Sequence, residues 1–424
     1  MQENKEANFI GGQWVKSNGE VIHSENPASG EMLWQAASAQ LADVDAAVGA
    51  ARAAFATWRL LDFAERESYV AKFVDCLKQH QEELAQAIHQ ETGKPFWESK
   101  TEIATMIGKA GISKAAYDAR TGEKESSVNS IEVRLAHRPI GVFAVLGPYN
   151  FPGHLPNGHI IPALLAGNTI VFKPSELTPR FGELMIACWE QAGLPAGVVN
   201  LIQGARDTGA ALVNADDING VLFTGSSKAG HAIHKALAGQ PDKMLALEMG
   251  GNNALIIDQV ADENAAVYTI IQSAFISAGQ RCTCARRLIV VKSTANESLV
   301  KRLVEATSKI KVGSDDSCFI GPVVSNAAAD GAMAFEAELV SAGAKSLLAL
   351  SRDDTSRPFI HPGLIDVTGA SGIVDEECFA PLLQIQWVDD LHAAVEVTNS
   401  TRYGLSAGLL SDNDTAWDYF YPRI

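Results

Sequence analysis

The sequence lacks the long apolar segments that mark membrane-spanning and exported chains. No run of about 18 or more consecutive apolar residues occurs, so no membrane-spanning helix is expected. The N-terminal stretch MQENKEANFIGG contains no apolar core of signal-peptide length. Cysteine is also scarce, with 6 irregularly spaced residues among 424. We therefore expect a cytoplasmic protein with reduced thiols.

Positive charge is in short supply as well. The chain has 34 Lys and Arg residues against 50 Asp and Glu residues, a formal charge of −16. Proteins that bind nucleic acid use basic surfaces to neutralise phosphates, so no nucleic-acid partner is expected. A small anionic ligand is compatible with this charge, because a local basic pocket acts at short range. The length suggests two or three domains at roughly 100–200 residues each.

The order of predicted elements indicates an α/β protein. Helical spacing dominates the N-terminal third, where apolar residues from Val44 to Trp58 recur in steps of three and four. A second helical stretch is predicted from about Glu67 to Gly93. From Gly141 onward, β-rich runs alternate with helical segments, which predicts parallel strands joined by right-handed crossovers. The predicted strands are Val142–Leu146, Thr169–Phe172, Val198–Ile202, Val221–Phe223, Leu245–Leu247, Leu255–Ile257 and Leu288–Val291, and two of the predicted helices are Phe181–Ala192 and Leu299–Ile310.

Residues 122–139 follow a different pattern. A polar cluster around Asn129 is followed by apolar residues at Ile131, Val133 and Leu135, alternating with charged or small ones. Alternation of this kind predicts a half-exposed strand or hairpin, here one that leaves the domain body.

A turn suited to a pyrophosphate follows the predicted strand Val221–Phe223. Ligands of parallel sheets bind at the carboxyl ends of the strands. Gly225 and Gly230 would let the backbone approach a phosphate, and a helix N-terminus at Ser226 would offer free N–H groups. The spacing is not G-x-G-x-x-G, so the alternative interpretation is an ordinary tight turn with a serine cap.

Lys173 and Glu176 follow another predicted strand, Thr169–Phe172. A lysine and a carboxylate at a strand end can together hold the hydroxyls of a ribose. The carboxylate would repel a 2′-phosphate, which favours NAD over NADP. The alternative is a solvated loop in which Ser175 caps the next helix.

Cys282, in the run Gly279-Gln-Arg-Cys282-Thr-Cys284, is the candidate nucleophile. A cysteine nucleophile requires a lowered pKa, which an adjacent cation such as Arg281 can supply. The alternatives are a buried structural thiol or half of a metal site. No metal is expected, because C-x-C lacks a second Cys/His pair at zinc spacing.

Other polar residues beside glycine or proline could complete the chemistry. Glu248, ahead of two glycines, could act as a general base, or it could be a capping or ion-paired residue. Asn150 could donate to an oxyanion, or it could belong to a proline-rich turn. Glu377 and Phe379 could hold a nicotinamide riboside, or they could form an exposed acidic turn with a core Phe.

Taken together and in this order, the motifs resemble the aldehyde dehydrogenase superfamily. The likeness runs from Phe9-Ile-Gly-Gly-Gln-Trp14 to Tyr403-Gly-Leu-Ser-Ala-Gly408. The stretches GPYNFPGHLPNGHIIPALLAGNT and GQRCTCARR narrow it to semialdehyde dehydrogenases of arginine breakdown. The resemblance implies a Rossmann-type NAD-binding domain (residues 1–121 and 140–250), an α/β catalytic domain (251–424) and a small hairpin (122–139) that bridges the subunits of a homo-oligomer.

The resemblance also implies NAD-dependent oxidation of an aldehyde through a thioester. Cys282 would attack the aldehyde, and the Asn150 amide and the Cys282 N–H would stabilise the oxyanion. Hydride would pass to the nicotinamide, and Glu248 would activate the water that releases the acid. The implied cofactor contacts are Lys173, Glu176, Gly225, Ser226, Gly230, Glu377 and Phe379.

An aldehyde that carries carboxylates needs cations or dense hydrogen-bond donors around it. Arg281, beside the nucleophile, is the predicted carboxylate contact; alternatively it only lowers the Cys282 pKa or pairs with an acid. His154 and His159 are further candidates, with ordinary helix packing as the alternative.

The sequence departs from the family pattern in three places. His159 stands where many members have lysine, and Ala380 replaces the usual glycine before Pro381. The chain stops at Ile424, where members continue, so we expect the C-terminal end of the fold to be missing and a sheet edge to be unpaired. Two rival functions stay open: a CoA-acylating relative, which Glu248 disfavours, and a truncated NAD-binding chain without turnover.

Overall fold

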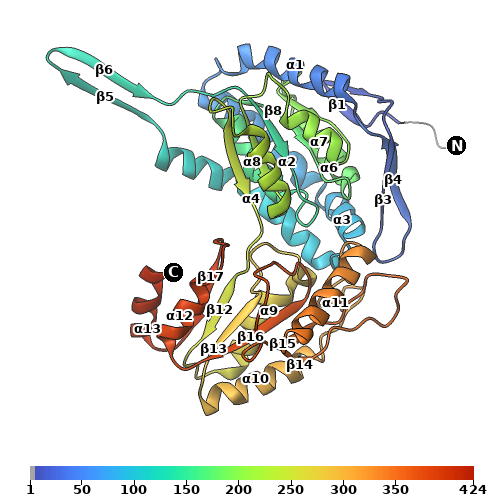
Figure 1. The fold of residues 1–424 in the computed structure, drawn as a ribbon. Helices are drawn as coiled ribbons and strands as arrows, with labels where there is room; N and C mark the ends of the chain where they lie inside the picture. Colours follow the sequence, from blue (N-terminus) through green and yellow to red (C-terminus); the bar gives the residue numbers. More distant parts are fainter. Residues whose placement is uncertain (1–4) are drawn as a thin grey trace. The chain divides into compact units, whose positions relative to one another are not determined.

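The computed structural model describes residues 5–424, which form two compact units (Figure 1). The first unit contains residues 5–26, 31–92 and 96–249. The second contains residues 27–30, 93–95 and 250–424. Each unit has its own sheet and its own hydrophobic core, so each is described by itself.

The first unit is built on a seven-stranded sheet with the order β11-β10-β7-β8-β9-β1-β2. Its central strands run parallel, as predicted, and they read as buried apolar runs because helices cover both faces. The parallel strands are β7 (Val142–Leu146), β8 (Thr169–Lys173), β9 (Val199–Leu201), β10 (Gly220–Thr224) and β11 (Met244–Glu248). Each lies within one residue of its predicted bounds at either end.

Alternate side chains of these strands enter two different cores. Phe143 and Val145 of β7 pack under helices α2 to α6, whereas Val142 and Ala144 pack under α1, α7 and α8. The helices are α1 (Leu41–Trp58), α2 (Phe63–Gln79), α3 (Gln81–Thr92), α4 (Phe96–Arg120), α5 (His154–Leu165), α6 (Pro179–Gln191), α7 (Arg206–Val213) and α8 (Ser227–Leu237).

The N-terminal third is mostly helical, as predicted, but one detail differs. The expected single helix from Glu67 is two helices, which break at His80; the first starts at Phe63, where Asp62 caps it by accepting from Glu65 N. The segment before α1, for which no element was predicted, forms short strands. It contains β1 (Asn8–Ile10), β2 (Gln13–Val15), β3 (Val21–Glu25) and β4 (Met32–Ala37). The two strands of three residues, β1 and β2, carry too little periodicity to be recognised.

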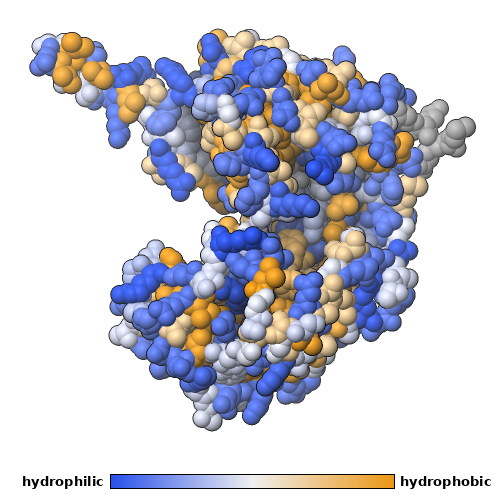
Figure 2. All heavy atoms as spheres, viewed as in Figure 1, coloured by the Kyte–Doolittle hydropathy of each residue, from blue (hydrophilic) through white to orange (hydrophobic). Residues whose placement is uncertain are grey.

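The hairpin predicted between residues 122 and 139 is present. It consists of β5 (Glu123–Val128) and β6 (Ile131–Ala136), joined by Asn129 and Ser130 with φ of 51° and 65°. Two consecutive left-handed residues are what a tight two-residue hairpin turn requires. The hairpin extends away from the helices of its unit (Figure 1), and apolar side chains are exposed along it (Figure 2). These are Val128, Ile131, Val133 and Leu135.

The second unit contains a six-stranded sheet with the order β14-β15-β16-β13-β12-β17. Its strands run parallel except β14. They are β12 (Ala254–Ile257), β13 (Arg287–Val291), β14 (Lys345–Leu348), β15 (Gly363–Asp366), β16 (Leu382–Val388) and β17 (Ala407–Leu410). The helices are α9 (Glu263–Phe275), α10 (Thr294–Thr307), α11 (Asn326–Ser341), α12 (Leu391–Asn399) and α13 (Asp414–Phe420). Among the helices of residues 5–424, none is both long and apolar enough to cross a bilayer.

Candidate active site

The carboxyl edge of the first sheet gathers the candidates predicted in that unit. Thr224 of β10 pairs with Glu248 of β11, and Leu146 of β7 pairs with Lys173 of β8. Because β7 lies between β8 and β10, the segments that follow these strands emerge side by side at one edge. The Asn150 loop, the Lys173 segment, the Gly225 turn and Glu248 therefore share this edge.

The Gly225–Gly230 turn is a tight strand-to-helix connection. Ser226 caps α8 by accepting from Ala229 N at 3.3 Å, and Gly225 N donates to Glu248 O at 3.0 Å. A Cβ on Gly225 would lie 2.5 Å from the Phe223 ring and one on Gly230 would lie 2.4 Å from the Met249 sulfur, so a neighbouring side chain would have to move to admit either. The serine-capped turn is thus present, and its first N–H groups open on the carboxyl edge.

Lys173 and Glu176 are neighbours, but the lysine is held by the backbone. Lys173 Nζ donates to Pro174 O at 2.6 Å and to Gly204 O at 2.7 Å, and it lies 3.9 Å from Glu176 Oε2. Burial lowers the pKa of Lys173 to about 8, although the Glu176 carboxylate opposes this shift. The alternative in which Ser175 caps α6 was wrong, because Thr178 is the residue that precedes this helix.

The loop with Asn150 is fixed by a carboxylate from α4. Glu102, itself buried, accepts from Gly153 N at 2.9 Å and from His154 N at 3.1 Å, so it binds the N-terminus of α5. Asn150 is buried within the same loop. His154 is the first residue of α5, and its ring meets that of Phe151 edge-on at 6.1 Å.

His159 lies further along α5 and contacts the end of β10. Its Nε2 is 3.0 Å from Thr224 Oγ1. Burial, together with the positive charge of Lys109, lowers the pKa of His159 to about 4. The imidazole is therefore neutral at pH 7 and offers hydrogen bonding rather than positive charge.

In the second unit the candidates gather at the opposite end of the strands, the amino edge. Asn253 directly precedes β12, and Arg286 directly precedes β13. The segment from Glu377 to Pro381 precedes β16, and the segment from Arg402 to Ser406 precedes β17. Since these strands are adjacent and parallel, the four segments meet at one edge, which carries Cys282.

The nucleophile candidate follows a turn of unusual backbone conformation. Ser277, Ala278 and Gly279 have φ of 57°, 53° and 72° in succession. Left-handed conformations are uncommon for residues other than glycine and are found where the surrounding structure enforces them. Position 279 requires glycine, because a Cβ there would lie 2.3 Å from the backbone oxygen of Ala380. Arg281 Nε donates to Ser277 Oγ at 2.8 Å, which folds its side chain back over this turn.

Cys282 differs from the other cysteines in its exposure. It is half-buried, whereas the other five free thiols, all within the described residues, are buried. Asn253 binds the backbone on both sides of Thr283. Its Nδ2 donates to Cys282 O at 2.7 Å and to Cys284 O at 3.0 Å. Its Oδ1 accepts from Ser406 N at 3.1 Å. The buried Asn253 amide thus connects the segments that precede β12, β13 and β17.

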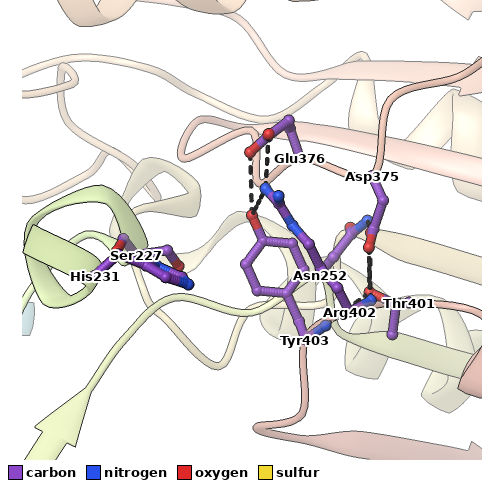
Figure 3. Close-up of polar contacts among 8 residues, drawn as sticks. All are labelled: Ser227, His231, Asn252, Asp375, Glu376, Thr401, Arg402 and Tyr403. Atoms are coloured by element: carbon purple, nitrogen blue, oxygen red, sulfur yellow. Dashed lines mark hydrogen bonds and ion pairs between the residues drawn. The ribbon is translucent and has the colours of Figure 1, made fainter. Parts of the chain in front are cut away.

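The acidic loop before β16, residues 375–377, is held by a network of hydrogen bonds and an ion pair (Figure 3). Asp375 accepts from Asn252 Nδ2 at 2.8 Å, Thr401 Oγ1 at 2.9 Å and Arg402 N at 2.7 Å. Glu376 accepts from Arg402 at 2.6 Å and from the Tyr403 hydroxyl at 3.1 Å. The next carboxylate in the loop, Glu377, is turned inward and largely buried.

The profile of the aldehyde dehydrogenase family matches residues 14–424 of this chain. The chain belongs to the aldehyde dehydrogenase family. It is therefore an enzyme that oxidises aldehydes, and the resemblance inferred from the sequence is confirmed.

Relatives of this dehydrogenase are closely similar over almost the whole chain. An N-succinylglutamate 5-semialdehyde dehydrogenase of Vibrio cholerae is 52% identical over 98% of this chain and 86% of its own. One of Pseudomonas fluorescens is 52% identical over 97% of this chain and 85% of its own. The narrower likeness to semialdehyde dehydrogenases is thus also confirmed.

Solved structures of family members have the same fold. Methylmalonate-semialdehyde dehydrogenase of Oceanimonas doudoroffii superposes with a TM-score of 0.93 at 27% identity, covering 100% of this chain and 88% of that one. A 1-pyrroline-5-carboxylate dehydrogenase from Thermus with bound NAD gives 0.91 at 28% identity, covering 99% and 83%. Because such structures match this dehydrogenase throughout, the expectation that the C-terminal end of the fold is missing is not supported.

Several residues that build the site were missed by sequence reasoning. Asn253, Glu102 and Arg286 all act through contacts with segments far away in the chain. Arg286 stands within the quoted run GQRCTCARR, and Asn253 follows the glycine pair after Glu248, so their places in the motifs were visible. Their side-chain directions had no signal in residue spacing.

Asn253→Ala is expected to lower the free energy of unfolding by about 3 kcal/mol, since three hydrogen bonds of a buried amide are lost at about 1 kcal/mol each. Urea unfolding measures this loss. The matched control is Asn399→Ala, which removes a single exposed bond to Arg423 O at 2.8 Å and should cost no more than about 1 kcal/mol. Equal losses in the two variants would show that Asn253 does not hold the nucleophile turn.

Proposed function

We propose that this dehydrogenase oxidises N-succinylglutamate 5-semialdehyde to N-succinylglutamate with NAD. The observation that carries the proposal is the 52% identity, over nearly the whole chain, to relatives of that name. It is supported by Cys282, the half-buried thiol on a turn held by Asn253.

The residues of the first unit fit a dinucleotide. The Gly225–Gly230 turn offers the N-terminus of α8 to a pyrophosphate, with Ser226 at its cap. Lys173 and Glu176, at the end of β8, would hold the adenosine ribose, and the Glu176 carboxylate favours NAD over NADP. In the second unit, Glu377 would hold the nicotinamide ribose, with Phe379 packing beside the ring. NAD, when bound, accepts the hydride of the aldehyde carbon.

The proposed chemistry assigns one task to each catalytic residue. The Cys282 thiolate forms a bond to the aldehyde carbon, and the carbonyl oxygen becomes an oxyanion. The Asn150 amide and the Cys282 N–H donate to that oxyanion. Loss of hydride leaves an acyl thioester on Cys282. Glu248 takes a proton from water, the hydroxyl attacks the acyl carbon, the C–S bond breaks, and the carboxylate leaves as the thiolate is restored.

The substrate carboxylates need donors near the aldehyde. Arg281 is the proposed carboxylate contact, since it adjoins the nucleophile and its bond to Ser277 Oγ restricts the side chain. His154 and His159 are proposed to add hydrogen bonds from α5, with His159 in its neutral form.

We further propose the organisation that the family resemblance implies. Residues 1–121 and 140–250 bind NAD, residues 251–424 carry the nucleophile, and residues 122–139 join subunits of a homo-oligomer. The exposed apolar side chains of the hairpin support the last point. Six free cysteines support a cytoplasmic, reducing location.

The mechanism is tested by following NADH absorbance with N-succinylglutamate 5-semialdehyde. Cys282→Ala is expected to lose turnover by about 10⁴-fold or more, because the covalent step is removed. Glu248→Gln is expected to release about one NADH per active site and then stall, since the thioester forms but is not hydrolysed; mass spectrometry of the Cys282 peptide should show the acyl group.

Undiminished turnover in Cys282→Ala would reject the mechanism. Steady turnover of Glu248→Gln at the wild-type rate would remove Glu248 from the deacylation step. Turnover that requires added CoA would point instead to a CoA-acylating enzyme.

Lys173 predicts a pH dependence of cofactor binding. Its pKa of about 8 means that the ammonium is charged below that pH and loses its proton as the pH rises through it. Calorimetry should therefore show the NAD dissociation constant rising by about three- to tenfold from about pH 7 to about pH 9, as a charge-assisted hydrogen bond weakens. Lys173→Met should bind weakly at both pH values. Lys235→Met, which changes an exposed lysine of α8, should keep the wild-type profile, and a flat wild-type profile would contradict the role of Lys173.

A further inference from the structure

Arg286 is a buried cation beside the nucleophile turn. Its side chain is 1% exposed. Its Nη2 donates to Arg281 O at 2.9 Å and lies 3.4 Å from Glu377 Oε1, so one nitrogen faces acceptors from two different segments. Its guanidinium carbon lies over the ring of Phe379, 5.3 Å from the centroid. The arginine therefore contacts the nucleophile turn and both proposed nicotinamide-side residues.

The contact with Arg281 O bears directly on the proposed oxyanion donor. The carbonyl of Arg281 and the N–H of Cys282 belong to the same peptide group. The peptide is planar and trans, so these two bonds point in opposite directions. Cys284 N also donates to Arg281 O, at 3.1 Å. Two donors on the oxygen thus fix where the Cys282 N–H points, and a cationic donor polarises the amide and strengthens that N–H as a donor.

The contact with Glu377 fixes a second proposed ligand. The Glu377 carboxylate lies between Arg286 and the Gly250–Gly251 backbone: a Cβ on Gly250 would lie only 1.8 Å from Glu377 Oε2. Burial raises the pKa of Glu377, whereas the charge of Arg286 and the Gly251 N–H act to lower it. The arginine thus supports both the position and the ionisation of this carboxylate.

Packing alone does not account for this arginine. Its Nε and Nη1 are buried and have no hydrogen-bond partner within residues 5–424. Buried donors without partners weaken the folded state, and an apolar side chain of similar length would avoid that loss. Arg287, the next residue, shows what a structural arginine does here: it donates to Asn252 O, Val397 O and Thr398 O.

We propose that Arg286 is a positioning residue for the reaction, which aims the Cys282 N–H at the oxyanion and holds Glu377 for the nicotinamide ribose. This inference rests on the proposed function. It assigns Arg286 a task in chemistry and in cofactor binding, beyond stabilising the fold.

The first test separates oxyanion stabilisation from the reactivity of the thiol, without NAD. With p-nitrophenyl acetate, the Cys282 thiolate attacks the ester carbonyl through an oxyanion, p-nitrophenolate leaves, and water hydrolyses the acetyl thioester. With iodoacetamide, the same thiolate displaces iodide at a carbon that forms no oxyanion. Arg286→Met should slow the p-nitrophenol burst by about tenfold or more, yet change the alkylation of Cys282 by less than about twofold.

Two further variants complete this test. Arg286→Lys keeps the charge and should recover part of the burst rate. Arg302→Met is the matched control, because Arg302 of α10 pairs with Glu263 of α9 at 2.8 Å in an exposed setting and should leave both rates unchanged. Peptide mass spectrometry assigns the alkylated cysteine, and Cys282→Ala gives the background.

The second test concerns Glu377. Calorimetry should show NAD binding weakened by about fivefold or more in Arg286→Met and unchanged in Arg302→Met. Arg286→Met in a Glu377→Gln background should weaken NAD binding little further, because the carboxylate that the arginine holds is already gone.

Several outcomes would overturn the proposal. A parallel fall of burst and alkylation in Arg286→Met would indicate a disrupted turn rather than a misdirected N–H. A burst unchanged in that variant, or absent from the wild-type protein, would remove the oxyanion role, and unchanged NAD affinity would remove the Glu377 role. Failure of the proposed function is seen separately, as wild-type protein that binds NAD and gives the ester burst but does not oxidise the semialdehyde.

Discussion

The buried side-chain amide of Asn253 holds together the segments that form the candidate site of the second unit. It bonds the carbonyl oxygens of Cys282 and Cys284 and the backbone N–H of Ser406, so it links the starts of β12, β13 and β17. Parallel strands bring such segments to one edge of a sheet although they are far apart in the chain. Without a polar group to bridge them, their backbone donors and acceptors would meet without partners at a buried edge.

The candidate residues lie at the carboxyl edge of the first sheet and at the amino edge of the second. The sequence predicted the first of these locations but not the second. The rule that ligands meet the carboxyl ends of parallel strands located the Gly225 turn, Lys173 and Glu248 in the first unit. In the second unit the proposed nucleophile, Cys282, lies at the amino edge, where that rule gives no guidance. Cys282 was recognised by its motif rather than by its place in a sheet.

Hydrophobic patterning predicted the parallel strands of the first sheet and, in the second sheet, β12 and β13. Strands buried on both faces, such as β7 and β10, read as unbroken apolar runs and were predicted to within one residue. The hairpin was predicted from its polar turn and its alternation. By contrast, β1 and β2 are only three residues long, and their pairing with each other and with β9 depends on tertiary structure. The break at His80 lies inside a continuous helical pattern, so periodicity alone missed it.

Burial affects the charge of the basic side chains in the candidate site, and this bears on why residue 286 is an arginine. Burial lowers the pKa of His159 to about 4 and that of Lys173 to about 8. A guanidinium keeps its charge in such surroundings, because that charge is delocalised and less strongly hydrated than an ammonium. Arginine therefore suits the buried position behind the Cys282 peptide better than lysine. The planar group can also pack its face on Phe379 while one edge serves the backbone, which a lysine ammonium cannot do. The burial of residue 286 beside the proposed nucleophile thus favours arginine over lysine.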